Sequence, residues 1–360
     1  MQRDPEFEVQ VWTARGLQHV LVGLRSGLYK HMPIEQTDIS VLIPTYRYRD
    51  KVVRAVESAL ASDAGEIVVV DDCGRDGTIE RLAAYSDPRL RIYENAYNMG
   101  LWENHLQALG MATRPWIKFI QADDYLLPGG LMAFADGAGD GVTVVFGVPT
   151  VRDDVTAELS YFHWLERPRR VTPSQLQEAC LFGGWILGSP SHMLLRSDAI
   201  ERDPAAWRTQ VSSDLVIGSI TAACGDTVLL PVGAIGQGAH PLQNAKTQNS
   251  RLALERMVAS LAYLRRRSEP GLRWLANMWT CLAFKSLFRT AMRGAIRREG
   301  SLAEMAAFPW RLIGDLSHED WQQIYRDRSR LKEAARFRSK TQAPYDLDAL
   351  LDHIACPKLG

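Results

Sequence analysis

Two pairs of adjacent carboxylates stand just after apolar runs in the first half of the chain. A run at 67–70 precedes the pair 71–72, and a run at 116–120 precedes Asp123 and Asp124. Adjacent carboxylates suit a hard divalent cation, because Mg²⁺ and Mn²⁺ take one or two carboxylates and complete their shell with phosphate oxygens and water. The second pair therefore predicts a metal site facing a phosphate-bearing ligand. The alternative is that one of its side chains caps the helix expected to begin near Pro128.

These carboxylates must be positioned by the elements around them. Short β-branched runs alternate with helical patterns between residues 39 and 150. This order predicts right-handed βαβ units, hence an open, mostly parallel sheet with helices on its faces. The runs are apolar throughout, as expected for strands buried on both sides.

Further polar residues follow the other expected strands. Pro44 and Tyr46 close the first run, and Asn98 and Gly100 follow the third. Ligands of open parallel sheets bind outside the carboxyl ends of the strands, so these residues predict one binding site at that edge. The first strand is not followed by G-x-G-x-x-G, and neither a P-loop nor a G-x-S-x-G elbow occurs, which argues against a dinucleotide fold, a P-loop enzyme and an α/β-hydrolase.

The pattern of apolar and polar residues divides the chain into four regions. Residues 1–38 are expected to form a helical leader that ends near Pro33, and 39–150 form the α/β half. Residues 151–248 are irregular, and 249–360 form a helical extension, since Leu252, Met257, Leu261 and Leu264 open an apolar stripe.

Composition narrows the classes of protein. The 360 residues include 42 Lys+Arg and 42 Asp+Glu, and 46% of the residues are apolar. A zero net charge argues against a nucleic-acid binder, and five scattered cysteines without a C-x-x-C pair argue against a zinc ribbon or a secreted disulfide scaffold. No signal peptide or membrane span is recognisable, so we expect a cytoplasmic protein, with peripheral contact to the inner membrane left open.

Four motifs together carry a family resemblance. Ser40-Val-Leu-Ile-Pro-Thr-Tyr46, Val68-Val-Val-Asp-Asp-Cys-Gly-Arg-Asp-Gly-Thr78, Asn98-x-Gly100 and Gln121-Ala-Asp-Asp124 occur in this order. The chain thus resembles the family 2 glycosyltransferases, inverting enzymes of GT-A fold that use nucleotide-diphosphate sugars. The resemblance is firm over about 38–150 and weaker over 150–245.

The resemblance implies roles for the residues of the sheet edge. Pro44 and Tyr46 would line the nucleobase pocket, and Asp72 would accept a hydrogen bond from the base, with Asp71 supporting the local backbone. Asn98 and Gly100 would flank the donor sugar. Asp123 would face the ribose or sugar, and Asp124 would ligate the Mn²⁺ or Mg²⁺ that bridges the diphosphate.

An inverting transfer needs one general base, separate from the metal ligands, to deprotonate the acceptor hydroxyl. In the resembled family this base begins a helix in the second half of the domain. Ser212-Ser213-Asp214 before an apolar helical stretch matches that layout and makes Asp214 the candidate. The alternative is a structural N-cap, and Asp198, Asp203 and Asp226 are competing carboxylates.

Three more residues are assigned by the resemblance, each with a plain alternative. His240, in Gly238-Ala-His240-Pro241, would complete the metal site or touch the diphosphate, or is a surface histidine. Trp185 and Ser191 lie in a glycine-rich segment expected to shape the pocket. They would contact the acceptor, although Trp185 suits a core position equally well.

The helical extension carries a local charge excess. Residues 251–300 hold eleven Lys/Arg and three Glu, interleaved with Trp274, Trp279, Phe284 and Phe288. Basic amphipathic helices with aromatic residues can lie on an anionic membrane, which would suit a lipid-linked acceptor. The same pattern also fits a homodimer contact, or packing on the catalytic domain with solvated arginines.

Taken together, the sequence predicts a metal-dependent, inverting glycosyltransferase that moves a sugar from a nucleotide-diphosphate sugar to a hydroxyl of a saccharide or lipid-linked acceptor, in bacterial polysaccharide or glycoconjugate synthesis. The alternative is a non-catalytic nucleotide-sugar-binding or scaffolding member of the same fold. A nucleotidyltransferase would need a glycine-rich basic loop after the first strand, where Pro44-Thr-Tyr46 stands instead.

Overall fold

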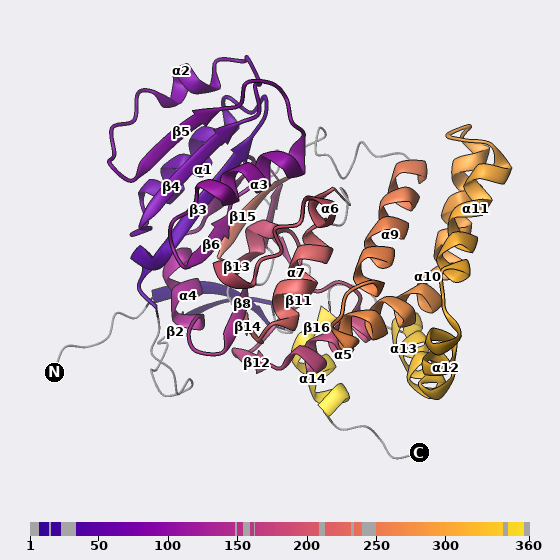
Figure 1. The fold of residues 1–360 in the computed structure, drawn as a ribbon. Helices are drawn as coiled ribbons and strands as arrows, with labels where there is room; N and C mark the ends of the chain where they lie inside the picture. Colours follow the sequence, from indigo (N-terminus) through magenta and orange to yellow (C-terminus); the bar gives the residue numbers. More distant parts are fainter. Residues whose placement is uncertain are drawn as a thin grey trace.

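The fold is described from a computed structural model. It describes residues 7–13, 16–22, 34–147, 150–153, 159–161, 163–208, 213–231, 234–239, 250–340 and 345–355. An eight-stranded sheet in the order β12-β14-β8-β13-β6-β3-β4-β5 forms its centre (Figure 1).

The first-half strands of this sheet run parallel, as predicted. They are β3 (Ile39–Thr45), β4 (Glu66–Asp71), β5 (Leu90–Glu94) and β6 (Trp116–Phe119), with β3 paired to both β4 and β6 and β5 at the edge. Every residue of β3, β4 and β6 is buried, because helices cover both faces.

The second-half strands make the sheet mixed. Strand β13 (Met193–Arg196) runs antiparallel between β6 and β8 (Val142–Gly147), whereas β14 (Asp226–Leu230) is parallel to β8. Strand β12 (Arg169–Val171) adds an antiparallel edge. The reversed β13 brings its first residue, Met193, to the edge where β6 ends.

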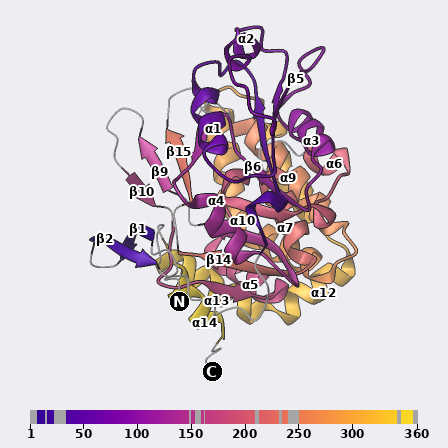
Figure 2. The ribbon, with the colours of Figure 1, turned by 90° about the vertical axis from the view of Figure 1, so that its left-hand side faces the viewer.

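A smaller sheet, in the order β10-β9-β15-β7, stands beside the main one (Figure 2). Its strands are β7 (Asp124–Leu126), β9 (Thr150–Asp153), β10 (Leu159–Tyr161) and β15 (Ile235–Ala239). Because Asp124 begins β7 and pairs with Gln237 of β15, this sheet fixes the backbone that follows the second acidic pair. A third sheet pairs β11 (His163–Trp164) with β16 (Tyr345–Asp346).

Alternate residues of the strands pack against different helices. Val41 and Ile43 face a cluster that includes α1 (Lys51–Leu60) and α4 (Gly130–Gly137). Leu42 and Phe119 face the other cluster, which includes α3 (Leu101–Met111), α5 (Pro173–Gly183) and α7 (Ser213–Ala223). The short helices are η1 (Gln36–Asp38), α2 (Thr78–Leu82), η2 (Pro190–His192), η3 (Ser197–Ala199) and α6 (Pro204–Trp207).

The C-terminal region is helical, as predicted. Its helices are α9 (Ser250–Arg265), α10 (Pro270–Ile296), α11 (Leu302–Gly314), α12 (His318–Arg326), α13 (Arg328–Lys340) and α14 (Leu347–Ala355). They pack on α5: the indole N–H of Trp279 and the guanidinium of Arg338 both donate to the carbonyl of Cys180, at 3.0 Å each. Among the described residues, no helix is long and apolar enough to cross a membrane.

The predicted N-terminal helix is wrong. The described residues of the leader form two antiparallel strands, β1 (Phe7–Thr13) and β2 (Gly16–Val22), with Thr13 paired to Gly16. The physical reason lies in local preference: apolar residues alternate with polar ones from 7 to 11, and both segments are rich in valine, which favours strands.

Candidate active site

The carboxyl ends of β3 and β4 meet in a buried polar junction. Thr45, the last residue of β3, pairs with Asp71, the last residue of β4. From α3, the amide of Asn104 donates to the carbonyls of Thr45 at 3.3 Å and Val70 at 3.0 Å. The carbonyl of Thr45 also accepts from the backbone N–H of Asp72 at 2.9 Å, so the Asn104 amide adds to the backbone bonds that hold this edge in one geometry.

The carboxylate of Asp72 binds protein groups on both oxygens. Its Oδ1 accepts from the backbone N–H of Met99 at 2.8 Å and from the amide of Asn95 at 2.9 Å, and its Oδ2 accepts from the N–H of Gly100 at 2.8 Å. The residue is 2% exposed. Asp72 therefore anchors the loop that enters α3, which is a structural duty beyond the base contact we predicted for it.

Asp71 has the opposite arrangement. One of its oxygens accepts from the N–H of Gly74 at 2.7 Å, which is the backbone support predicted for it, while its Oδ1 is buried without a hydrogen-bond partner among the described residues. Burial raises the pKa of Asp71, against the lowering effect of the Gly74 bond, and nearby Asp76 and Glu94 raise it further. Gly74 is required here, since a Cβ would lie 2.9 Å from the backbone nitrogen of Arg47.

The predicted base-pocket residues border this junction. Pro44 is buried within β3, whereas the Tyr46 ring is 37% exposed and lies 5.1 Å from the guanidinium carbon of Arg47. Gly100 caps α3 with a φ of 98°, a conformation that favours glycine, and Asn98 is exposed just before it. An exposed aromatic ring beside a guanidinium is available to stack on a planar ligand.

The two residues of the second acidic pair, Asp123 and Asp124, differ in solvent exposure. Asp124 is 1% exposed, whereas Asp123 is only partly buried. Both carboxylates lie near the loop after β3, because together with burial they raise the pKa of Tyr48 to about 12. From α1, Arg54 donates to the carbonyl of Asp123 at 3.2 Å and stacks 4.1 Å above the ring of Tyr125. Of the two carboxylates predicted to contact the ligand, Asp123 is therefore the more accessible.

Beneath Asp124 lies a fully buried lysine, Lys118 of β6. Its ammonium donates to the carbonyls of Phe119 at 3.3 Å, Met193 at 3.2 Å and Ser191, and its charge interacts with Asp124. Burial lowers the pKa of Lys118 well below its usual value, and Asp124 opposes that effect. The negative charge of Asp124 therefore favours the protonated form of this lysine, against the effect of burial.

Ser191, predicted at the acceptor, is fully buried in η2. Its hydroxyl accepts from the backbone N–H of Gln121 at 3.0 Å, and its carbonyl accepts from Lys118. Such a serine has no surface for an acceptor. It holds the turn that carries Asp123.

The donor set around Asp123 fits a cation that is completed by its substrate. Within the described ranges, no group of three or more His, Cys, Asp or Glu side chains could hold a metal ion. Mg²⁺ bound with nucleotides typically takes only one or two carboxylates plus phosphate and water oxygens, which a single edge carboxylate can support. His240 lies outside the described residues, directly after β15, whose Gln237 pairs with Asp124.

Asp214 lies in the first turn of α7, and topology places that turn at the same edge. The far end of α7 is level with the start of β8, since the carbonyl of Thr221 accepts from Thr143 at 2.8 Å. One turn earlier, a Cβ on Gly218 would meet the sulfur of Met193 at 3.2 Å. Asp214, one further turn along the same face, therefore extends past Met193 toward the carboxyl edge.

Burial raises the pKa of Asp214 to about 7, and hydrogen bonds from the backbone N–H groups of Leu215 and Asp214 itself oppose the rise. A base whose pKa lies near neutrality combines a useful deprotonated fraction with proton affinity. The competing carboxylates have other duties: Asp198 pairs with Arg196 at 2.6 Å, and Asp226 with Arg170 at 2.7 Å.

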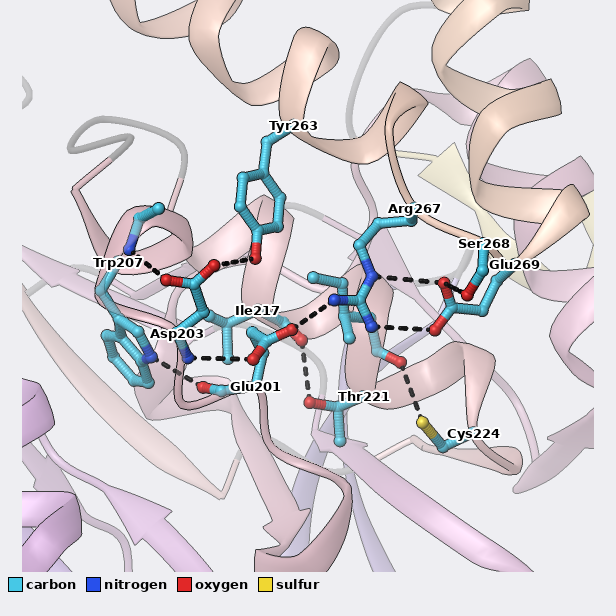
Figure 3. A network of polar contacts seen from close by, with 12 residues as sticks. Glu201, Asp203, Trp207, Ile217, Thr221, Cys224, Tyr263, Arg267, Ser268 and Glu269 are labelled. Atoms are coloured by element: carbon cyan, nitrogen blue, oxygen red, sulfur yellow. Dashed lines mark hydrogen bonds and ion pairs between the residues drawn. The ribbon is translucent and has the colours of Figure 1, made fainter.

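The remaining competitor, Asp203, belongs to a network that fastens α6 to α9 and to the segment after α9 (Figure 3). Its carboxylate caps α6 through the N–H of Ala205 at 2.9 Å and accepts from Tyr263 at 3.0 Å. Beside it, Arg267 joins Glu201 at 2.6 Å and Glu269 at 3.0 Å. Among the described residues, Asp214 is the one of the four candidate carboxylates that bonds no other side chain.

Trp185 is partly buried and packs against the hydrophobic core. Its indole N–H donates to the carbonyl of Gly188 at 3.0 Å, and its ring lies so close to α7 that a Cβ on Gly218 would meet it at 2.8 Å. Trp185 also lines a small cavity, whose other walls come from α5, α7 and α10 and include Leu176, Ser219 and Leu275. The structure thus favours the core alternative for Trp185.

An aromatic cluster that was not predicted from the sequence lies behind the carboxyl ends of β3 and β6. Trp102 and His105 of α3 pack on Trp207 of α6 and Phe119 of β6, with ring centroids 4.9 to 6.4 Å apart. Burial lowers the pKa of His105 to about 4, and its ring lies 2.8 Å from the amide of Gln121. The spacing of 102 and 105, one turn of one helix face, was the available signal.

Comparisons with known proteins agree with this geometry. The model of the glycosyl transferase family 2 matches residues 40–202. The succinoglycan biosynthesis protein ExoO of Rhizobium meliloti is 29% identical over 248 residues, 65% of this chain and 70% of that protein. The Escherichia coli protein WfaP, a UDP-Glc:alpha-D-GlcNAc-diphosphoundecaprenol beta-1,3-glucosyltransferase, is 32% identical over 89 residues, 24% of this chain and 36% of that protein.

A solved structure extends the likeness beyond the matched domain. The crystal structure of S. aureus TarS 1-349 in complex with UDP-GlcNAc superposes with a TM-score of 0.61 and 15% identity, over 83% of this chain and 89% of that one. At this identity the likeness concerns the fold alone. The matched domain, the mixed sheet and the carboxylates at its edge lead to one conclusion: residues 40–202 form a family 2 glycosyltransferase domain, and the chain has the GT-A fold.

Proposed function

We propose that this glycosyltransferase moves a sugar, with inversion, from a nucleotide-diphosphate sugar to a hydroxyl acceptor in the synthesis of a bacterial polysaccharide. The observation that carries the proposal is Asp214, a partly buried carboxylate whose pKa burial raises to about 7, at the edge that also holds Asp71 and Asp123. Relatives named for succinoglycan biosynthesis and for glucosyl transfer support the polysaccharide context.

In the proposed reaction, Asp214 accepts the proton of the acceptor hydroxyl while that oxygen attacks the anomeric carbon. The proton goes to the Asp214 carboxylate, the new glycosidic bond forms, and the bond to the diphosphate breaks on the opposite face of the sugar. A base held at the start of a rigid helix loses little orientation between the free and the bound enzyme.

The donor would bind across the ends of β3, β4 and β6. The exposed ring of Tyr46 would stack on the nucleobase, and the free Oδ1 of Asp71 or the already bonded carboxylate of Asp72 would accept from it. Asp123 would hold a Mn²⁺ or Mg²⁺ ion on the diphosphate, with Asp124 positioned behind it by Lys118. When bound, such an ion neutralises the charge that grows on the departing diphosphate.

Donor binding is tested first, without any acceptor. The full chain is incubated with UDP-, GDP- and dTDP-sugars, each with Mn²⁺ or with EDTA, and thermal unfolding is followed. A matching donor should raise the unfolding temperature only when the ion is present, because binding to the folded state alone stabilises it. Protection that is equal in EDTA would contradict the metal role, and Asp123→Ala should abolish ion-dependent protection.

Asp214→Asn then separates the enzyme from its non-catalytic alternative. With the donor identified, this variant should keep the thermal protection but lose transfer by at least about 100-fold, the usual contribution of a general base. Asp198→Asn is the control, because this carboxylate lies in the same half but pairs only with Arg196. An active Asp214→Asn would move the base elsewhere, and a wild type that binds donors without transfer to any tested acceptor would favour the binding subunit.

A further inference from the structure

The basic residues of the C-terminal helices fall into two groups. The first group is internal. Arg265 is 7% exposed and donates to Asn277 at 2.9 Å and Thr280 at 2.8 Å, and Arg273 pairs with Asp320 at 2.8 Å. Together with Arg267 in the network of Figure 3, these arginines hold the helices to one another. They explain part of the charge excess as structure.

The second group is exposed at the end of α10. It consists of four arginines that form no ion pair within the part of the chain that the structure describes: Arg289, Arg293, Arg297 and Arg298. The acidic residues nearby are Glu299, which accepts from the N–H of Ser250 at 2.6 Å, and Glu304, which accepts from that of Ser301 at 3.0 Å. These bonds leave the two carboxylates charged, but four arginines outnumber them, so an excess of positive charge remains on this surface.

Large apolar side chains are exposed beside these arginines. Ile296 is 81%, Leu302 63% and Trp310 59% exposed, and Phe288 is 38% exposed. Burying such side chains is favourable by about 1.5 to 3 kcal/mol each, so their exposure together indicates a surface that binds something apolar.

Helix α11 carries large apolar side chains on its buried face and on its exposed face. Its inner face, with Met305, Phe308 and Leu312, is buried against α9 and α10. Its two charged residues, Glu304 and Arg311, are exposed, and the large apolar side chains of Leu302 and Trp310 are exposed as well. Large apolar side chains grouped on an outer surface indicate a site that binds another molecule.

The two kinds of side chain are arranged in rows. On α10, Arg289, Arg293 and Arg297 follow one another at four-residue spacing, directly beside the row of Phe288 and Ile296. Trp310 of α11 joins this surface, since its ring lies 5.4 Å from that of Phe284. We name the surface of Phe288, Ile296, Leu302, Trp310 and the four arginines the α10–α11 tip; α11 lies at the margin of the molecule opposite β4 and β5 (Figure 1).

We propose that the α10–α11 tip binds the surface of an anionic phospholipid bilayer. The apolar side chains would enter the boundary between headgroups and acyl chains, and the arginines would contact the lipid phosphates. A second copy of the chain fits less well, because a symmetric contact would bring two sets of unpaired arginines together. A nucleic acid would pair with the arginines but leave Ile296 and Leu302 in water.

Vesicle sedimentation with the full chain tests this without donor, metal or acceptor. Vesicles of phosphatidylcholine alone are compared with vesicles that contain a third of phosphatidylglycerol. The protein should sediment with the anionic vesicles, at least about tenfold more strongly than with the neutral ones, and high salt should weaken the binding. Equal binding to both vesicles, or binding to neither, would overturn the proposal.

Two variants locate the contact. Arg293→Glu/Arg297→Glu should weaken binding to anionic vesicles by at least about tenfold, since each basic residue near the surface contributes about 1 kcal/mol. Ile296→Ser/Leu302→Ser should also weaken it and changes only exposed side chains. Arg81→Glu/Arg202→Glu is the matched control, with the same change in net charge at exposed sites elsewhere. An equal loss in the control would contradict this location, and so would a dimer in ultracentrifugation that the serine variant dissociates.

Discussion

At the scale of single residues, the site depends on what surrounds each carboxylate. Asp214 titrates near neutrality because burial raises its pKa to about 7. If it is the base, transfer at subsaturating donor should rise with pH through about 7 and level off above, since only the deprotonated form accepts a proton. A profile that falls over this range, or that is flat from pH 5 to 9, would contradict the assignment.

The same pKa has a consequence for stability. A carboxyl whose pKa is higher in the folded than in the unfolded state, about 7 against an ordinary 3.8, favours folding fully below 3.8 and loses that contribution as the pH rises to 7. Asp214→Asn removes the penalty, so it should raise the melting temperature by at least about 2 °C at pH 8 and by less at pH 4. Thermal unfolding of both proteins at the two pH values measures it, and equal shifts would contradict the raised pKa.

Substitution of Asp72 should destabilise the loop before α3, because this carboxylate holds the loop by three hydrogen bonds. Asp72→Asn keeps the shape but replaces one acceptor oxygen with an amide that faces the N–H donors of Met99, Gly100 or Asn95. Leaving a buried donor unsatisfied costs about 1 to 3 kcal/mol, so urea unfolding should shift by that amount and donor affinity should fall. Glu94→Gln on the exposed edge strand is the control, and an unchanged Asp72→Asn protein would show that the loop does not need this anchor.

At the scale of elements, helix α7, which carries the proposed base, packs closely against Trp185 at Gly218. A Cβ on Gly218 would lie 2.8 Å from the ring of Trp185, so Gly218→Ala must move α7 or the indole. We expect a loss of about 1 to 3 kcal/mol in unfolding free energy, together with reduced transfer, because Asp214 lies one turn away on the same face. Gly110→Ala in α3, where a Cβ would meet nothing within 4 Å, should be neutral or slightly stabilising. Equal effects of the two alanines would contradict this packing.

The sheet and its functional edge could be predicted from sequence because both are local patterns. Apolar runs that end in Asp71 and Asp123 indicate strand ends, and parallel strands bring their ends together. Which carboxylate of the second pair is the more exposed could not be predicted, and both carboxylates of the first pair proved to be buried. Burial of these side chains depends on partners distant in the chain, such as Lys118 beneath Asp124 and Gly100 against Asp72.

The N-terminal strands and Trp185 show two other limits. Leucine and valine at mixed spacing fit a loose helical stripe as well as an alternating strand, and a helix was the wrong choice for residues 7–22. For Trp185, the sequence left stacking on an acceptor and core packing open. The choice was decided by Gly218, whose missing side chain makes room for the ring.

At the scale of the whole molecule, α5 joins the sheet to the C-terminal helices. Trp279 is 7% exposed and donates to the carbonyl of Cys180, so it fastens α10 to α5. Trp279→Ala should lower the unfolding free energy by about 3 to 5 kcal/mol, seen as a lower midpoint in urea. Trp310→Ala, at a residue 59% exposed, should cost far less. A second, separate transition in Trp279→Ala would mean that the helical region unfolds independently, whereas a small shift would show that this contact is dispensable.

The chemical reactivity of Lys118 can report local opening of the structure at the proposed active-site edge. Its amine has no exposed surface and is enclosed by the carbonyls of Phe119, Ser191 and Met193 and by the ring of Phe134, 4.5 Å away. An acylating reagent can modify it only when β6, β13 and η2 separate. The rate of Lys118 acylation, followed by peptide mass spectrometry, would therefore report how often β6, β13 and η2 separate. A bound donor that stabilises this edge should lower that rate.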